Sequence, residues 1–132
     1  GSDLSRSDVV VVVVGEKPYS EGVGDRDSLH LSDEDLKLLK KVKNSNLPHV
    51  VILISGRPMI INEVIVDSDA FIAAWLPGTE GLGISDVMFG DFDFTGTLSM
   101  TWPKSMKQIP INYGDTNYDP LFQFGFGLSY NK

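Results

Sequence analysis

The chain has 132 residues, 42% of them hydrophobic, so it is long enough to bury one core and too short for two ordinary ones. Its formal net charge of −7 argues against nucleic acid or an anionic membrane as the main partner, because both need basic surfaces. Because there is no cysteine and the only histidines are His30 and His49, we expect no disulfide, thiol nucleophile or bound metal.

Three apolar segments predict strands of a parallel sheet. The first contains six consecutive valines at residues 9–14, the second covers residues 49–54 and the third covers residues 70–75. β-Branched residues without alternation are typical of strands that are buried on both faces, as in α/β proteins. The valine run is too short to span a bilayer, so we expect no membrane segment there.

Helical patterns lie between the predicted strands. Ser32 is a candidate N-cap, since acidic residues follow it in the first turn and lysines crowd the end of the same segment. The apolar stripe of this helix consists of Leu36, Leu39 and Val42. A short helix is expected at residues 62–66, and another from about residue 79 to residue 88.

The alternation of strands and helices predicts an α/β fold with right-handed crossovers, namely a three-layer α/β/α sandwich with a mainly parallel sheet. Doubly wound sheets usually have more than three or four strands, so we expect this one to lack its N-terminal βα units. After Gly90 the pattern stops, and the sequence predicts a short strand near residues 97–101 followed by a long wrapping tail.

The connection at residues 15–31 is long for a βα loop, and such length often marks function. It contains four acidic residues: Glu16, Glu21, Asp25 and Asp27. Carboxylates at the carboxyl end of a parallel strand suit general acid–base chemistry. A solvated acidic loop is the alternative interpretation, because exposed carboxylates are common.

Three other features are weaker indications of a site. Arg57, in a Ser-Gly-Arg-Pro step, could contact a ligand or fasten a loop, and fastening is favoured. Trp75 and Trp102 could stack on sugar rings, although the apolar strand that ends at Trp75 favours burial there. The sequence at residues 22–24 is Gly-Val-Gly and lacks both a third glycine and a following helix, so we expect no nucleotide cofactor.

Four stretches span nearly the whole chain in order: VVVVGEKPYSEGVGDR (11–26), VILISGRP (51–58), AAWLPGTEGLGISDVMFGDFDFTGTLSMTWPKS (73–105) and YDPLFQFGFGLSY (118–130). Through them the sequence resembles the second, α/β-sandwich domain of glycoside hydrolase family 3, the β-glucosidases and exo-β-glucanases. The resemblance implies that residues 1–132 are the C-terminal part of that domain, without the TIM-barrel domain.

The resemblance also implies a retaining mechanism. A barrel carboxylate attacks the anomeric carbon, and a glutamate of the sandwich domain protonates the leaving oxygen and later activates water. In this family that glutamate follows a Gly-Glu-x-Pro-Tyr segment, and the matching position here is Glu21. Glu16 is expected to shape the loop instead. The resemblance implies β-linked glucosides or oligosaccharides as substrates, and it assigns no sugar-binding residue and no cofactor.

We therefore expect the parent protein to be a β-glucosidase-type hydrolase and the isolated chain to be inactive, because the barrel and its nucleophile are absent. A non-catalytic sugar-binding or folding module is the alternative, whereas a flavodoxin-like nucleotide binder lacks its phosphate loop. We also expect the chain to self-associate through uncovered apolar surface of its first strand. The sequence leaves open whether the protein is secreted, periplasmic or cytoplasmic.

Overall fold

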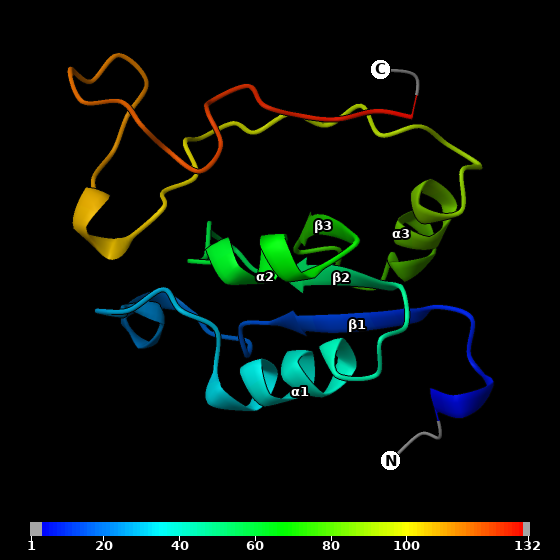
Figure 1. Cartoon of the computed structure of the whole chain (residues 1–132). Coiled ribbons are helices and arrows are strands. Elements are labelled where there is room, and N and C mark those ends of the chain that lie inside the picture. Colours follow the sequence, from blue (N-terminus) through cyan, green and yellow to red (C-terminus); the bar gives the residue numbers. More distant parts are fainter. Residues whose placement is uncertain (1–3, 131–132) are drawn as a thin grey trace. The chain divides into compact units, whose positions relative to one another are not determined.

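The computed structural model describes residues 4–130, which form two compact units, the first up to Leu76 and the second from Pro77 (Figure 1). The strands and α-helices of the first unit are β1 (Val10–Gly15), α1 (Asp33–Lys43), β2 (His49–Ile54), α2 (Asn62–Asp67) and β3 (Ala70–Trp75). The second unit contains α3 (Gly81–Met88). Short 3-10 helices occur at Leu4–Arg6, Glu21–Gly24 and Met106–Gln108.

The first unit is a parallel sheet with the strand order β1-β2-β3, so each consecutive pair of strands is joined by a helical crossover. The predicted α/β class with a parallel sheet is confirmed. The second and third strands cover the predicted residues, and the first is shifted by one residue and ends at Gly15. Among residues 4–130, no helix is long and apolar enough to cross a membrane.

The most deeply buried strand residues of this unit lie on one face of the sheet. Paired residues of parallel strands share a face, and the pairs Val12 with Val51 and Val14 with Leu53 are at most 4% exposed. Helix α1 packs on β1, beside which it is drawn in Figure 1. Burial of each such side chain contributes about 1.5–3 kcal/mol.

The opposite face of β1 is open to solvent. Val9, Val11 and Val13 are 50%, 42% and 55% exposed, so the prediction that the valine strand is buried on both faces is wrong for these residues. The reason is that no described residue packs closely over these side chains. β1 also lies at the edge of the sheet, where β2 is its only strand neighbour among the described residues.

The backbone of β1 also has a side without a neighbouring strand. The N–H of Val10 donates to the Pro48 carbonyl and that of Glu16 donates to the Ile54 carbonyl, so even-numbered residues between them face β2. The backbone groups of residues 11 and 13 consequently point to the outer edge, since successive residues of a strand alternate in direction. This edge is long, apolar and uncharged, which favours pairing with another strand.

The predicted N-cap of α1 is confirmed. The Ser32 hydroxyl oxygen accepts a hydrogen bond of 3.1 Å from the backbone N–H of Asp35. Along the predicted apolar stripe, Val42 is buried and Leu39 is half-buried, but Leu36 is 44% exposed. The C-terminal end of the stripe is therefore packed into the unit more closely than its first turn.

The expected strand near residues 97–101 is not formed. Leu98 exchanges two backbone hydrogen bonds of 2.8 Å with the tail, at Phe126 and Gly125, and the next contact comes only at Trp102, which bridges Phe122. Residues 99 and 100 bend between the two contacts, so no continuous ladder is formed. Trp102 is 2% exposed and packs edge-on against Phe122, so it serves as a core residue and not as a sugar platform.

We predict that the 132-residue chain self-associates through the open edge and face of β1. At physiological salt the repulsion from the net charge is screened beyond about 8 Å, and burying apolar area contributes roughly 25 cal/mol per Å². Sedimentation velocity at micromolar concentration should show a dimer or larger species, and replacing Val11 and Val13 with lysine should give a monomer. The matched control is Val66→Lys, at an 83% exposed position of α2, which should leave the association unchanged. A strictly monomeric wild-type chain would contradict the prediction.

Candidate functional site

Gly15 ends β1 at a point where only glycine fits. A Cβ atom added there would lie 1.9 Å from the carbonyl oxygen of Ile54, at the end of β2. The two strands therefore end in close contact, and the residue after Gly15 begins the loop at the carboxyl edge of the sheet. This local packing places the side chain of Glu16 next to the loop that follows β2.

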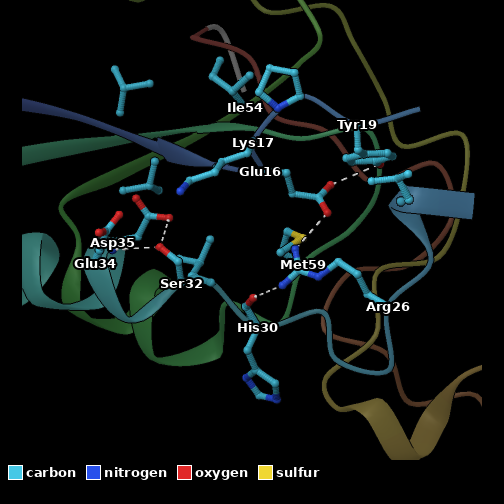
Figure 2. Close-up of a pocket in the computed structure, with 17 residues that line it drawn as sticks. Glu16, Lys17, Tyr19, Arg26, His30, Ser32, Glu34, Asp35, Ile54 and Met59 are labelled. Carbon is cyan, nitrogen blue, oxygen red and sulfur yellow. Dashed lines mark hydrogen bonds and ion pairs between the residues drawn. The ribbon is translucent and has the colours of Figure 1, made fainter. Parts of the chain in front are cut away.

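The carboxylate of Glu16 is the centre of the hydrogen-bond network at this edge. Its side chain is 4% exposed, and its Oε1 accepts from Arg57 Nε (3.0 Å), Arg57 Nη2 (2.8 Å) and Arg26 Nη1 (3.1 Å). The hydroxyl of Tyr19 lies 3.4 Å from Oε2. Figure 2 shows Glu16 pointing toward Tyr19 and Arg26, whereas Lys17 extends toward the start of α1.

This environment keeps Glu16 ionised. Burial is the largest single influence and raises its pKa, but the hydrogen bonds and charges of Arg57 and Arg26 together outweigh burial and hold the pKa below its ordinary value. The hydrogen bond to Glu16 likewise raises the pKa of Arg57 above its ordinary value. At neutral pH Glu16 is thus an acceptor for two guanidinium groups, and it has no proton to donate.

Arg57 joins the beginning of the loop to its end. Besides the two contacts with Glu16, its Nη2 donates to the Gly24 carbonyl at 2.7 Å. Its own backbone is fixed by Ser55, which is 2% exposed and donates from Oγ to the Arg57 carbonyl at 2.8 Å. The prediction that this arginine fastens a loop is confirmed.

The ring of Tyr19 fills the inside of the loop. A Cβ atom added to Gly24 would lie 2.2 Å from the ring, and one added to Gly56 would lie 3.0 Å from its hydroxyl oxygen. The guanidinium of Arg57 lies over the same ring, 4.7 Å from its centroid. The Gly-Val-Gly step therefore provides room for an aromatic ring, which explains a glycine there without any phosphate.

Glu21 lies between these anchored points and faces solvent. It is exposed, it begins the 3-10 helix Glu21–Gly24, and its carboxylate makes no hydrogen bond with any residue that the structure describes. Its φ of +52° is in the left-handed region, which costs a non-glycine residue about 1–3 kcal/mol. Asp25 and Asp27 are also exposed on this loop.

A hollow of about 590 Å³ lies beside the loop, at the carboxyl end of β1 (Figure 2). Its polar wall includes Glu16, Tyr19, Arg26, His30 and Ser32. Glu21 does not line this hollow, so the exposed carboxylate and the hollow are separate features of the loop. Within residues 4–130, no three side chains of metal-binding type are grouped closely enough to hold a metal ion.

Sequence reasoning did not identify the partners of Glu16. Arg26 is 10 residues away and Arg57 is 41 residues away, and no local pattern links either of them to the carboxylate. The available signal was topological, because residues that follow adjacent parallel strands meet at one edge of the sheet. Trp75, the other candidate platform, is half-buried at the irregular end of β3.

Comparison with known proteins identifies the family of the chain. The profile of the "Glycosyl hydrolase family 3 C-terminal domain" matches residues 2–130. An exo-1,3/1,4-beta-glucanase from a Pseudoalteromonas species matches all of this chain with 46% identity and a TM-score of 0.92, over 23% of its own chain. A beta-glucosidase from Listeria innocua in complex with isofagomine matches 96% of the chain with 30% identity and a TM-score of 0.89, over 21% of its own chain.

Curated sequences agree with the structural matches. A beta-xylosidase from Formosa agariphila is 36% identical over an alignment of 146 positions, which covers 98% of this chain and 20% of the relative. A lysosomal beta glucosidase from Dictyostelium discoideum is 38% identical, over 94% of this chain and 16% of the relative. The chain thus spans about a fifth of the length of the proteins that it matches.

We predict that Glu16→Gln destabilises the chain by about 1.5–3 kcal/mol at pH 7, the range for hydrogen bonds to a charged group. The lowered pKa of Glu16 means that its stabilising effect is complete above the pKa of an unfolded glutamate and is lost as pH falls through the folded pKa. Urea unfolding at pH 7 and at successively lower pH should therefore show the difference between wild type and variant shrinking in acid. Glu21→Gln, at an exposed position, is the control and should change stability by less than about 0.5 kcal/mol. A difference that does not depend on pH would contradict the ion-pair explanation.

Proposed function

The chain belongs to glycoside hydrolase family 3, and we propose that it is the acid/base-bearing portion of a retaining β-glycosidase that hydrolyses β-glucosides or β-glucans. The observation that carries this proposal is the contrast between the two glutamates of the loop. Glu16 is buried and ionised between two arginines, whereas Glu21, to which the family resemblance assigns the acid/base role, is exposed. Glu21 is therefore free to exchange a proton with a bound sugar and with water.

In the proposed reaction Glu21 acts twice. Its protonated carboxyl donates the proton to the glycosidic oxygen as the bond to the anomeric carbon breaks and a second carboxylate bonds to that carbon. The ionised Glu21 then removes a proton from the water that attacks the glycosyl intermediate, which frees the second carboxylate. The two carboxyl groups of a retaining site lie about 5–5.5 Å apart, and this chain supplies the first of them.

We place the second carboxylate outside these 132 residues. Residues 1–132 then form the C-terminal part of the sandwich domain, and a TIM-barrel domain of a longer protein carries the nucleophile. The chain matches about a fifth of the length of its relatives, which is compatible with this arrangement. Asp25 and Asp27 share the loop with Glu21, but both are exposed acidic groups without the features of a held nucleophile.

The proposed substrates are β-linked glucosides and oligosaccharides. Solved relatives from Listeria innocua are beta-glucosidases in complex with glucose, gluconolactone and, for a D270A mutant, laminaribiose. Curated relatives also include beta-xylosidases, so a β-xyloside is the comparison substrate in any assay of specificity. A non-catalytic sugar-binding module is the competing function, and the exposed Glu21 has no evident purpose in it.

We predict that Glu21→Gln in the complete enzyme slows hydrolysis of substrates with poor leaving groups by about 10²–10⁴-fold, the usual value of general acid–base assistance. The effect on bond cleavage should be much smaller for aryl β-glucosides with activated leaving groups, which need little protonation. The measurement is kcat/KM across a series of leaving groups. Asp25→Asn, on the same loop, is the matched control and should show no such dependence. Equal losses for good and poor leaving groups would contradict the acid role of Glu21.

We also predict that the isolated chain hydrolyses no aryl β-glucoside detectably, because one carboxylate cannot perform the double displacement. Adding a separately produced barrel domain should restore some activity if the chain is the acid/base portion, and none if it is a non-catalytic module. The result against this prediction would be robust activity of the chain alone that disappears when Asp25 is changed to asparagine.

A further inference from the structure

We propose that Arg57 is a positioning residue of this site: by binding both ends of the loop that carries Glu21, it fixes where the Glu21 carboxyl group meets a substrate. This inference rests on the proposed function of Glu21. It assigns to a residue of the next strand connection, far from Glu21 in the sequence, a task in the glycosidase reaction.

The contacts of one guanidinium close the loop at both ends. Arg57 Nε and Nη2 bind Glu16, five residues before Glu21, and Nη2 also binds the carbonyl of Gly24, three residues after it. The three distances are 3.0, 2.8 and 2.7 Å, and the two contacts of Nη2 are as short as charge-assisted hydrogen bonds usually are. The segment from residue 16 to residue 24 is thus held as a closed loop with Glu21 in its outer part.

Arg57, which acts as a clamp on the loop, is itself anchored beside the sheet. Arg57 follows β2 by three residues, and the buried Ser55 donates to its backbone carbonyl. Inside the loop, the Tyr19 ring packs on Gly24 and beneath the guanidinium, so the loop cannot collapse inward. Arg57 therefore connects the outer part of the loop to the end of β2.

Glu21 depends on its backbone for orientation, because its own carboxylate makes no hydrogen bond with a described residue. Its backbone has a φ of +52°, a conformation that a loosely held glutamate would leave. Contacts at both ends of the loop restrict the neighbouring residues and so maintain this conformation. Catalytic groups need such support, since a displacement of about 1 Å can cost about 10²-fold in rate.

An arginine suits this task because its Nη2 binds Glu16 and Gly24 together, while its Nε makes a second contact with Glu16 that fixes the direction of the guanidinium. A planar guanidinium presents several donors in a fixed fork, whereas a lysine ammonium is a single point donor on a flexible chain. Arg57→Lys keeps the positive charge near Glu16 but lacks the Nε contact that orients the guanidinium, so the contact with Gly24 should no longer be held in place. Arg26→Met is the matched control, because Arg26 binds the same Glu16 oxygen without reaching Gly24.

The kinetic test uses the complete enzyme with a series of aryl β-glucosides. Arg57→Lys and Arg57→Met should lower kcat/KM by about 10²-fold for poor leaving groups and by only a few-fold for activated ones, with a smaller and less selective effect for Arg26→Met. In the Glu21→Gln background, Arg57→Lys should cause little further loss, because residues that act through one group are not additive.

A second readout uses the 132-residue chain and requires no activity. In Arg57→Lys, amide hydrogen exchange at residues 21–25 should accelerate relative to wild type, while exchange in β2 stays unchanged. Unchanged exchange at residues 21–25 would overturn the clamp even if the variant were inactive. Faster exchange in both segments would show general destabilisation and would equally count against a local positioning role.

The outcomes separate this inference from the proposed function. If Glu21→Gln shows no dependence on the leaving group, the acid role itself fails, and the positioning role fails with it. If Glu21→Gln behaves as an acid variant but Arg57→Lys lowers kcat/KM equally for every leaving group, or adds its full loss to that of Glu21→Gln, only the positioning role is overturned.

Discussion

The ion pair between Glu16 and Arg57 is the contact on which the organisation of the loop depends. A buried carboxylate is strongly unfavourable unless it is paired and hydrogen-bonded, and here three guanidinium N–H groups, two from Arg57 and one from Arg26, converge on one carboxylate oxygen. The pair forms because β1 and β2 are parallel and in register, so the residues that follow Gly15 and Ile54 meet at one edge. Arg57 also binds the Gly24 carbonyl, so the segment from Glu16 to Gly24 is closed at both ends.

The same loop shows how different the environments of two identical side chains can be. Glu16 lies in the protein between positive charges that stabilise its ionised form, whereas Glu21 lies in solvent and is free of such partners among the described residues. A carboxylate held ionised by two guanidinium groups can support structure but has no proton to deliver. Glu21, five residues further on, has no such cationic partner among the described residues and is accessible from solvent.

Two glycines are needed here because other atoms lie where a side chain would be. Gly15 allows the backbone of β1 to approach the Ile54 carbonyl, and Gly24 leaves room for the Tyr19 ring. The ring in turn supports the guanidinium of Arg57. A motif that could be read as a phosphate-binding turn is therefore explained by packing, which agrees with the membership of the chain in a family of glycoside hydrolases.

The sequence by itself determined the local elements and the family. Continuous apolar runs specified the strands at residues 49–54 and 70–75, and the hydroxyl of Ser32 specified the start of α1, because these depend on neighbours along the chain. Tertiary structure alone decided which valines of β1 face solvent and that residues 97–101 do not form a strand, since both depend on what lies alongside. It alone also joined Glu16 to Arg57 across 41 residues, because strand register, and no sequence pattern, brings them together.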